Sequence, residues 1–235
     1  MNNNNSVLLS IIVPIYNEEK TLKVILEKLS ELKKINLNFE VIVVNDGSTD
    51  NSLQILETLN QHYNKLITEE RNRGKGYAVK RGISEANGKY ITFQDADLEY
   101  EPHDLSKFFD MINKFDPDLV IGSRLNYSNY TRSHNILNKF ANMLITFLFN
   151  IFNNTTFTDI YSCYFCFKKD LIDIDKIKAE GFDQQAEILS KVVKNGKKFY
   201  EVPISYNGRN YQEGKKIKFY HIFGVIYQIL IGKFK

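Results

Sequence analysis

Apolar residues along this chain occur either in short unbroken runs or in longer stretches where they recur every three or four positions. The short runs are typical of strands buried on both faces of a sheet, and the longer stretches of amphipathic helices. The pattern predicts strands at residues 10–15, 39–44, 65–68, 90–93, 118–121 and 164–167. It predicts helices at residues 18–32, 51–63, 76–86, 103–115, 136–152 and 184–193. Strands that alternate with helices indicate an α/β fold with a mostly parallel, doubly wound sheet.

Length and composition narrow the class of protein. The 235 residues suit one α/β domain or two small ones, and 43% hydrophobic with 25% charged residues is ordinary for a globular chain. We expect a single domain over residues 1–235, with a disordered start at 1–6. A net charge of +3 gives no reason to expect nucleic acid as a partner. Two cysteines, Cys163 and Cys166, exclude a disulfide scaffold and a four-cysteine zinc site.

Two apolar segments raise the question of a membrane. Residues 136–152 and 219–234 are rich in Leu, Ile and Phe, but polar residues interrupt both, and each falls short of the about 20 clean apolar residues that a span needs. Lysines flank the second segment, at Lys215, Lys216, Lys218, Lys233 and Lys235. The basic, apolar tail at 215–235 suits a helix lying on an anionic membrane surface. The alternative is that both segments are core-packing helices with solvated flanks.

The strand at 90–93 leads into two aspartates, Asp95 and Asp97. Residues two apart on a strand point to the same side, so the two carboxylates are expected to converge. Hard anionic oxygens of this kind suit Mg²⁺ or Mn²⁺. A divalent ion with few protein ligands leaves positions open for substrate phosphates. The pair therefore predicts an enzyme that acts on a phosphorylated substrate, and a nucleotide in particular.

Polar residues follow the other predicted strands as well, where ligands bind in sheets of this kind. They are Tyr16, Asn17 and Glu18, then Asp46, then Arg73, Lys75 and Gly76, and finally Ser123 and Arg124. Each has a structural alternative: Asp46 can form a turn with Gly47, and Arg124 can be a surface charge. Asp159 can cap a turn, Glu187 can lie on a solvated helix face, and Arg209 can belong to a charged tail. The convergence of the residues that follow the predicted strands at one sheet edge is stronger evidence for a binding site than any one of these residues.

Several segments together resemble family 2 glycosyltransferases of the GT-A fold. They are residues 10–18, 43–50, 72–78, 94–99 with Pro102, and 122–124. Thr158-Asp159, Cys163-Tyr164, residues 201–203, and Arg209 with 213–217 make the chain similar to the dolichyl-phosphate mannose or glucose synthase-like branch. Members of that branch load a sugar onto a polyprenyl phosphate. One departure is Phe165, which stands where many relatives have lysine.

The resemblance implies a role for individual residues. It implies that Asp95 and Asp97 hold Mg²⁺ or Mn²⁺ with Glu99 as a third ligand. It implies catalytic roles for Asp97, Asp159 and Arg124. The expected contacts to the nucleoside-diphosphate sugar come from Pro14, Tyr16, Glu18, Asp46, Lys75, Asp95, Ala96, Arg209 and Lys215.

The expected activity is an inverting, metal-dependent transfer of a sugar from a GDP-mannose or UDP-glucose type donor to a polyprenyl phosphate. One alternative is a family 2 enzyme that extends a glycan at a sugar hydroxyl, with Asp159 or Glu187 as general base. Another is a catalytically silent nucleotide-sugar-binding protein. The enzyme is expected at the cytoplasmic face of a membrane as a peripheral protein, with a separate membrane-anchoring partner or a homo-oligomer as open possibilities.

Overall fold

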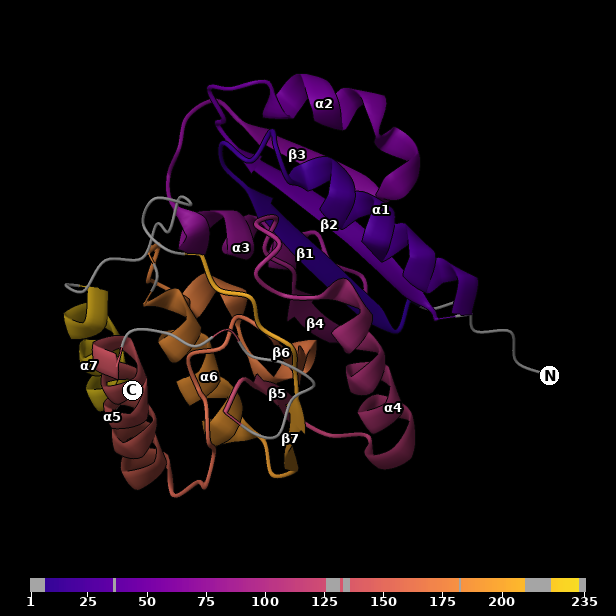
Figure 1. Ribbon diagram of the computed structural model, residues 1–235. Helices are drawn as coiled ribbons and strands as arrows, with labels where there is room; N and C mark the ends of the chain where they lie inside the picture. Colours follow the sequence, from indigo (N-terminus) through magenta and orange to yellow (C-terminus); the bar gives the residue numbers. More distant parts are fainter. Residues whose placement is uncertain are drawn as a thin grey trace.

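A seven-stranded sheet lies at the centre of the computed structural model (Figure 1), which describes residues 7–35, 37–125, 132, 136–181, 183–209 and 221–232. The strand order is β3-β2-β1-β4-β6-β5-β7. The strands are β1 (Leu9–Ile15), β2 (Phe39–Asp46), β3 (Lys65–Glu69), β4 (Tyr90–Phe93), β5 (Leu119–Ser123), β6 (Phe165–Lys168) and β7 (Phe199–Pro203). Neighbouring strands are parallel, except that β6 runs antiparallel to both β4 and β5.

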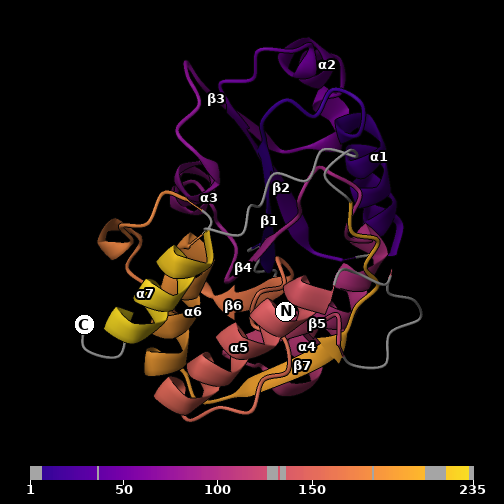
Figure 2. The same ribbon diagram turned by 60° about the vertical axis from the view of Figure 1, so that its left-hand side comes forward.

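Helices cover both faces of the sheet (Figures 1 and 2). One apolar core lies under α1 (Leu22–Leu32), α2 (Ser52–Thr58) and α4 (Leu105–Phe115). A second core lies under α3 (Lys75–Ser84), α5 (Ile136–Asn153), α6 (Gln184–Asn195) and α7 (His221–Gly232). Short 3-10 turns occur at Lys33–Ile35, Asn60–His62, Pro102–Asp104, Lys169–Leu171 and Ile174–Lys176. The predicted doubly wound α/β sheet is confirmed, and the two predicted late apolar helices are α5 and α7.

The unbroken apolar runs have the expected cause. In β1, Ile11 and Val13 face the first core, while Ile12 between them faces the second, and all three are fully buried. A strand that is covered by helices on both faces needs apolar residues at every position, because successive side chains point to opposite faces. The sequence pattern therefore reports the two layers of helices as well as the strand.

The structure corrects the boundaries of two predicted helices and the direction of one strand. The predicted helix from residue 18 begins at Leu22, because Asn17 adopts a left-handed conformation (φ 54°) and a turn follows it. The helix expected up to residue 63 ends at Thr58 and continues as a 3-10 turn. The strand β6 lies between β4 and β5 and is antiparallel to them. A short buried run looks the same in either direction, so periodicity alone does not indicate this reversal.

Within the part of the chain that the structure describes, no helix is long and apolar enough to cross a membrane.

Candidate active site

A cavity of about 520 Å³ lies beyond the carboxyl ends of β1, β2 and β4, and residues of α5, α6 and α7 form its opposite wall. Most of the predicted site residues line it: Pro14, Tyr16, Glu18, Asp46, Lys75, Asp95, Ala96, Asp97, Glu99, Arg124 and Arg209. The structure places Asp159 behind Arg124, outside this lining. Lys215 lies outside the described residues. The sequence-predicted constellation is thus brought together around one cavity.

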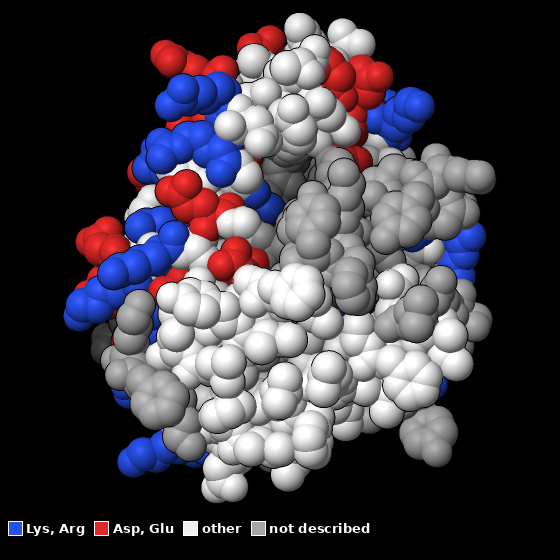
Figure 3. Space-filling view, turned by 90° about the vertical axis from the view of Figure 1, so that its left-hand side faces the viewer, with Lys and Arg blue, Asp and Glu red and all other residues white. Residues whose placement is uncertain are grey.

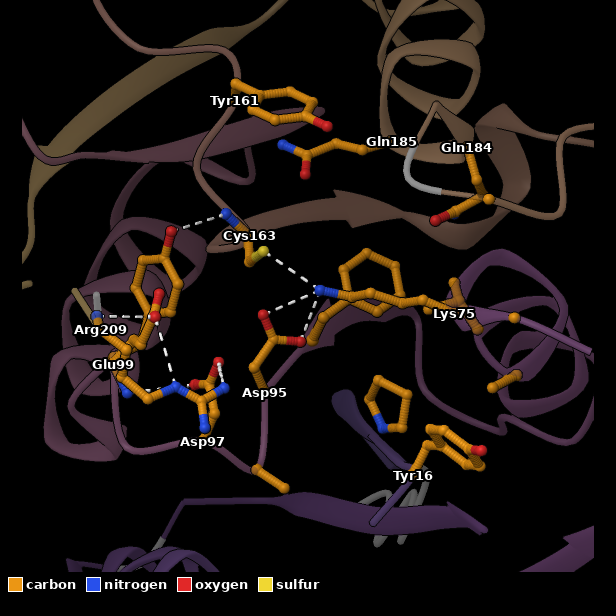
Figure 4. Close-up of a pocket in the computed structure, with 18 of the residues that line it drawn as sticks. Tyr16, Lys75, Asp95, Asp97, Glu99, Tyr161, Cys163, Gln184, Gln185 and Arg209 are labelled. Atoms are coloured by element: carbon orange, nitrogen blue, oxygen red, sulfur yellow. Dashed lines mark hydrogen bonds and ion pairs between the residues drawn. The ribbon is translucent and has the colours of Figure 1, made fainter. Parts of the chain in front are cut away.

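Asp95 forms an ion pair with Lys75 in the middle of the cavity (Figure 4). The Nζ atom of Lys75 lies 2.6 Å from one carboxylate oxygen of Asp95 and 3.2 Å from the Cys163 Sγ. Burial alone lowers the pKa of the Lys75 amine, but the charge of Asp95 outweighs it and the pKa is raised. Burial likewise opposes ionisation of Asp95, yet Lys75 holds the pKa of Asp95 below its usual value. Both groups are therefore charged at neutral pH.

Lys75 reaches this position because a tight loop precedes α3. Gly74 has a φ of 101°, a backbone conformation that side chains rarely adopt. At Gly76, a side-chain carbon would lie 2.6 Å from the backbone of Glu180. Asp46, at the end of β2, fixes the same loop, since its carboxylate accepts hydrogen bonds from the Arg73 and Gly74 amides at 3.0 and 2.8 Å. Asp46 lines the cavity and also holds the loop that carries Lys75.

Asp97 and Glu99 share Arg209 (Figure 4). The Nη2 of Arg209 donates to Asp97 at 2.8 Å, and its backbone amide donates to Glu99 at 2.9 Å. Arg209 also lies 3.6 Å from the Glu18 carboxylate. Burial and the charges of Asp95 and Glu99 raise the pKa of Asp97 to about 7, although Arg209 opposes this shift. The raised pKa of Asp97 reflects burial first and the crowding of negative charge second.

The donor set at this end of the cavity fits a divalent cation. Among the described residues that line the cavity, five are acidic and three are basic: Glu18, Asp46, Asp95, Asp97 and Glu99 against Lys75, Arg124 and Arg209. Carboxylate oxygens are the ligands that Mg²⁺ and Mn²⁺ prefer.

The carboxylate of Glu99 accepts hydrogen bonds from two protein groups. One of its oxygens accepts from the Tyr206 hydroxyl at 2.8 Å and the other from the Arg209 amide. Among the described residues, no three His, Cys, Asp or Glu side chains gather as a preformed metal cluster. The assignment of Glu99 as a third metal ligand stays a prediction.

Arg124 is held rigidly at the end of β5. Its Nε and Nη2 donate to the two oxygens of Asp159 at 2.7 and 2.8 Å, and Asn142 of α5 donates to the same carboxylate at 2.9 Å. Asp159 is fully buried. Burial opposes its ionisation, but Arg124 holds the pKa of Asp159 below its usual value. Arg124 faces the cavity and Asp159 positions it from behind.

Sequence reasoning missed part of the lining. Tyr100, Tyr161, Tyr206 and Gln185 line the cavity but follow no motif that marks them as ligands. Tyr100 and Tyr206 pack with ring centroids 5.0 Å apart, across the isolated bridge that joins their backbones. An aromatic or amide residue gives no periodic signal that would separate a ligand from a core residue.

Glu187, the alternative general base, accepts hydrogen bonds from the Lys178 and Ala179 amides and lies outside the lining of the cavity.

Comparison with known proteins establishes the family. The family model described as glycosyl transferase family 2 matches residues 10–174, most of the chain. The protein belongs to glycosyl transferase family 2, as its motifs indicate.

Two curated relatives are of the expected branch. The dolichol-phosphate mannosyltransferase of Pyrococcus furiosus is 30% identical over 213 residues, which cover 88% of this chain and 58% of that protein. The dolichyl-phosphate beta-glucosyltransferase of Saccharomyces cerevisiae is 30% identical over 225 residues, covering 86% of this chain and 67% of that protein. Matches to three curated relatives span between 42% and 67% of their lengths.

A solved structure confirms the fold class. Glucosyl-3-phosphoglycerate synthase from Mycobacterium tuberculosis, in complex with Mg²⁺ and uridine diphosphate, matches with a TM-score of 0.70 and 17% sequence identity. The match covers 97% of this chain and 79% of that one. The same enzyme is also solved with Mn²⁺ and uridine diphosphate. At this level of identity the likeness defines the GT-A fold and nothing finer.

Proposed function

We propose that the protein is an inverting glycosyltransferase that moves a sugar from a nucleoside-diphosphate sugar to a polyprenyl phosphate. The observation that carries the proposal is the single cavity in which the aspartate pair meets Lys75, Arg124 and Arg209. Its acids suit a divalent cation and its bases suit phosphates. The donor is of the GDP-mannose or UDP-glucose type, in keeping with the two relatives named above.

The donor is proposed to lie along the ends of β1, β2 and β4. Pro14, Tyr16, Glu18 and Asp46 contact the nucleoside, with Ala96 beneath the sugar-diphosphate. Asp95 and Asp97 would hold Mg²⁺ or Mn²⁺, and the bound cation would neutralise charge on the leaving diphosphate. Lys75 and Arg209 exchange their carboxylate partners for donor phosphate oxygens, and Lys215 adds a further contact of this kind.

The transfer itself needs no proton shuttle. An ionised phosphate oxygen of the acceptor attacks C1 of the sugar and forms the new C–O bond. The bond from C1 to the diphosphate oxygen breaks, and its electron pair leaves with the nucleoside diphosphate. Arg124 orients the acceptor phosphate, while Asp159 and Asn142 hold its guanidinium at the required angle. One displacement inverts the configuration at C1.

A sugar-hydroxyl acceptor would need a general base, and the structure disfavours both candidates. Asp159 is fully buried and bonded to Arg124 and Asn142. Glu187 is bonded to two backbone amides away from the cavity. The glycan-extending alternative is therefore the weaker one, and the paired, charged cavity gives no support to a catalytically silent protein.

The setting of the enzyme belongs to the same proposal. Residues 1–235 act as one catalytic domain at the cytoplasmic face of a membrane, in peripheral contact with it. A separate anchoring partner or a homo-oligomer is compatible with this arrangement.

Turnover is the test of the proposed function. The protein is incubated with Mg²⁺ or Mn²⁺, a panel of GDP- and UDP-sugars and a polyprenyl phosphate in detergent, and in parallel with a soluble oligosaccharide in place of the lipid. We expect labelled lipid and nucleoside diphosphate in equal amounts with one donor. Donor cleavage without lipid labelling, combined with labelling of an oligosaccharide, would overturn the lipid-phosphate acceptor and support a glycan hydroxyl.

A further inference from the structure

Two helices carry most of the exposed apolar side chains. Of the eleven large hydrophobic side chains that are exposed within the described residues, nine lie on α5 or α7. They are Ile136, Phe140, Met143, Leu144, Phe147, Ile151, Phe223, Tyr227 and Leu230. We refer to these nine residues as the α5–α7 face. The two helices pack against each other, so the nine side chains form one surface.

Helical spacing explains why these side chains share one side. The exposed positions of α7 are three or four residues apart, and those of α5 follow the same repeat with Met143 and Leu144 adjacent, which is the pattern of one helix face. The opposite side of each helix is buried in the second core, through Ile145 and Phe149 of α5 and Val225 and Ile229 of α7. Figure 3 shows a broad surface without charged side chains over this part of the molecule. A helix at the surface of an ordinary monomer has a polar outer side.

The charge of the surrounding sequence indicates what this face contacts. Between Asp118 and Asp159 the chain holds no acidic residue and, besides Arg124 of the cavity, two basic ones, Arg132 and Lys139. From residue 214 to residue 235 it holds five lysines and no acidic residue. Apolar side chains flanked by bases and free of acids suit a bilayer that contains anionic lipids. An apolar partner protein gives no reason for an excess of basic over acidic residues around the contact surface.

The same helices also form a wall of the active-site cavity. Asn142 and Ile145 of α5 and Ile222 of α7 line the cavity from the side opposite the α5–α7 face. A lipid phosphate bound at Arg124 would therefore have the start of its hydrocarbon chain at this wall. Insertion of the outer side of these helices would bring the cavity to the level of the headgroups.

We infer that the α5–α7 face inserts into the headgroup and upper acyl region of an anionic bilayer, so that the cavity opens at the membrane surface. The inference deepens the proposed function and rests on it, since the bilayer supplies the polyprenyl phosphate. It goes further by naming the surface, its orientation and the lipid charge that it requires.

A fluorescent reporter tests insertion directly. The chain contains no tryptophan, so Phe140→Trp gives a single reporter on the α5–α7 face. Val24→Trp is the matched control, because Val24 is also exposed (39%) but lies on α1, on the other face of the sheet. With vesicles of phosphatidylcholine and phosphatidylglycerol, we expect a blue shift and quenching by brominated acyl chains for Phe140→Trp only. Equal behaviour of the two reporters would overturn the inference.

Introduction of negative charge on the α5–α7 face gives a second test. The double variant Phe140→Glu/Phe147→Glu is expected to sediment with the same vesicles at least about tenfold more weakly, since two aromatic side chains lose their apolar contact. Val24→Glu is expected to bind as the wild type does. Undiminished binding of the double variant would overturn the inference. If circular dichroism shows that the double variant is unfolded, the tryptophan reporters decide the question.

Self-association is the competing explanation, and gel filtration separates it. The inference would be overturned if the wild type is a dimer, the double variant is a monomer, and neither of them binds vesicles. The α5–α7 face would then contact a second copy of the chain. Failure of the proposed function gives a different result. It would show as no transfer to a water-soluble short-chain prenyl phosphate in the absence of vesicles, while the vesicle measurements stay as expected.

Discussion

At the scale of single residues, Arg209 is the positive charge that balances three carboxylates of the cavity. It spans Glu18, Asp97 and Glu99, with its closest contact at 2.8 Å to Asp97. The proposed divalent cation would use the same Asp97 carboxylate. The guanidinium and the cation therefore compete for that carboxylate until donor phosphates offer Arg209 other partners.

This competition gives a prediction for Arg209→Gln. Removal of one positive charge is expected to tighten Mn²⁺ binding about tenfold in the absence of donor, because a unit charge that repels the cation and occupies the Asp97 carboxylate is lost. Turnover is expected to fall at least about tenfold, because a donor-phosphate contact is lost. Electron paramagnetic resonance titration of Mn²⁺ measures the first effect and initial rates the second. Arg81→Gln, with the same charge change outside the cavity, is the control. Equal Mn²⁺ affinities for wild type and Arg209→Gln would contradict the competition.

The aspartate pair gives a second prediction at this scale. Asp97→Asn keeps the shape of the side chain but removes an anionic metal ligand. Turnover is expected to fall at least about a hundredfold, and Mn²⁺ binding to weaken in the same variant. Asp170→Asn, an exposed carboxylate outside the cavity, is expected to behave as the wild type. Near-normal turnover of Asp97→Asn would remove Asp97 from the proposed metal site.

Whether a site residue can be predicted from the sequence depends on whether its side chain is charged. Asp95, Lys75 and Arg124 are recognisable because they are charged residues that follow predicted strands, where ligands bind in sheets of this kind. Cys163 contacts Lys75 in the cavity, but as a small half-buried residue in an apolar run it is marked only by the resemblance of Cys163-Tyr164 to the family. Tyr100 belongs to no motif that marks it as a ligand. The sequence therefore predicts the charges of the site better than its walls.

At the scale of elements, Arg124 and Asp159 join the end of β5 to the segment before β6, and Asn142 adds α5. Asp159→Asn leaves the Arg124 guanidinium inside the protein without its counter-charge. The free energy of unfolding at neutral pH is expected to fall by about 3–5 kcal/mol. Urea denaturation measures it, with the exposed Asp110→Asn as a control that changes little.

The pH dependence of that loss follows from the sign of the pKa shift. The pKa of Asp159 is lower in the folded protein than its ordinary value of 3.8. The ion pair therefore contributes its full stability above that value and loses it as pH falls below it. The difference between wild type and Asp159→Asn should shrink in acid. A difference that is constant down to the acid-unfolded state would show that packing, and not the charge, is responsible.

The elements themselves were predictable to different degrees. The strands of the first half follow from their apolar runs, and right-handed crossovers then fix their parallel order. The antiparallel insertion of β6 did not follow, because Phe165 to Phe167 are apolar on both faces whichever way the strand runs. The turn at Asn17 was also missed, since its left-handed backbone depends on the 2.8 Å bond that the Asn17 side chain accepts from the Thr49 amide.

At the scale of the whole molecule, charge is distributed unevenly although the net charge is only +3. Acidic residues are missing from the sequence around α5 and α7 and gather instead in the cavity, at Asp95, Asp97 and Glu99. The proposed lipid surface and the proposed divalent cation would thus encounter different parts of the same chain. Net charge alone conceals this division.

The uneven charge predicts how salt affects the two kinds of acceptor. The Debye length falls from about 10 Å at 0.1 M salt to about 3 Å at 1 M, so attraction between flanking lysines and anionic headgroups is screened first. Transfer to a polyprenyl phosphate in anionic vesicles is expected to slow several-fold over this range. Transfer to a short-chain, water-soluble prenyl phosphate should slow less, because Lys75 and Arg124 are partly buried and screened less by salt. Initial rates at the two salt concentrations measure both. An equal loss for both acceptors would place the salt effect in the cavity and leave the flanking lysines without a role.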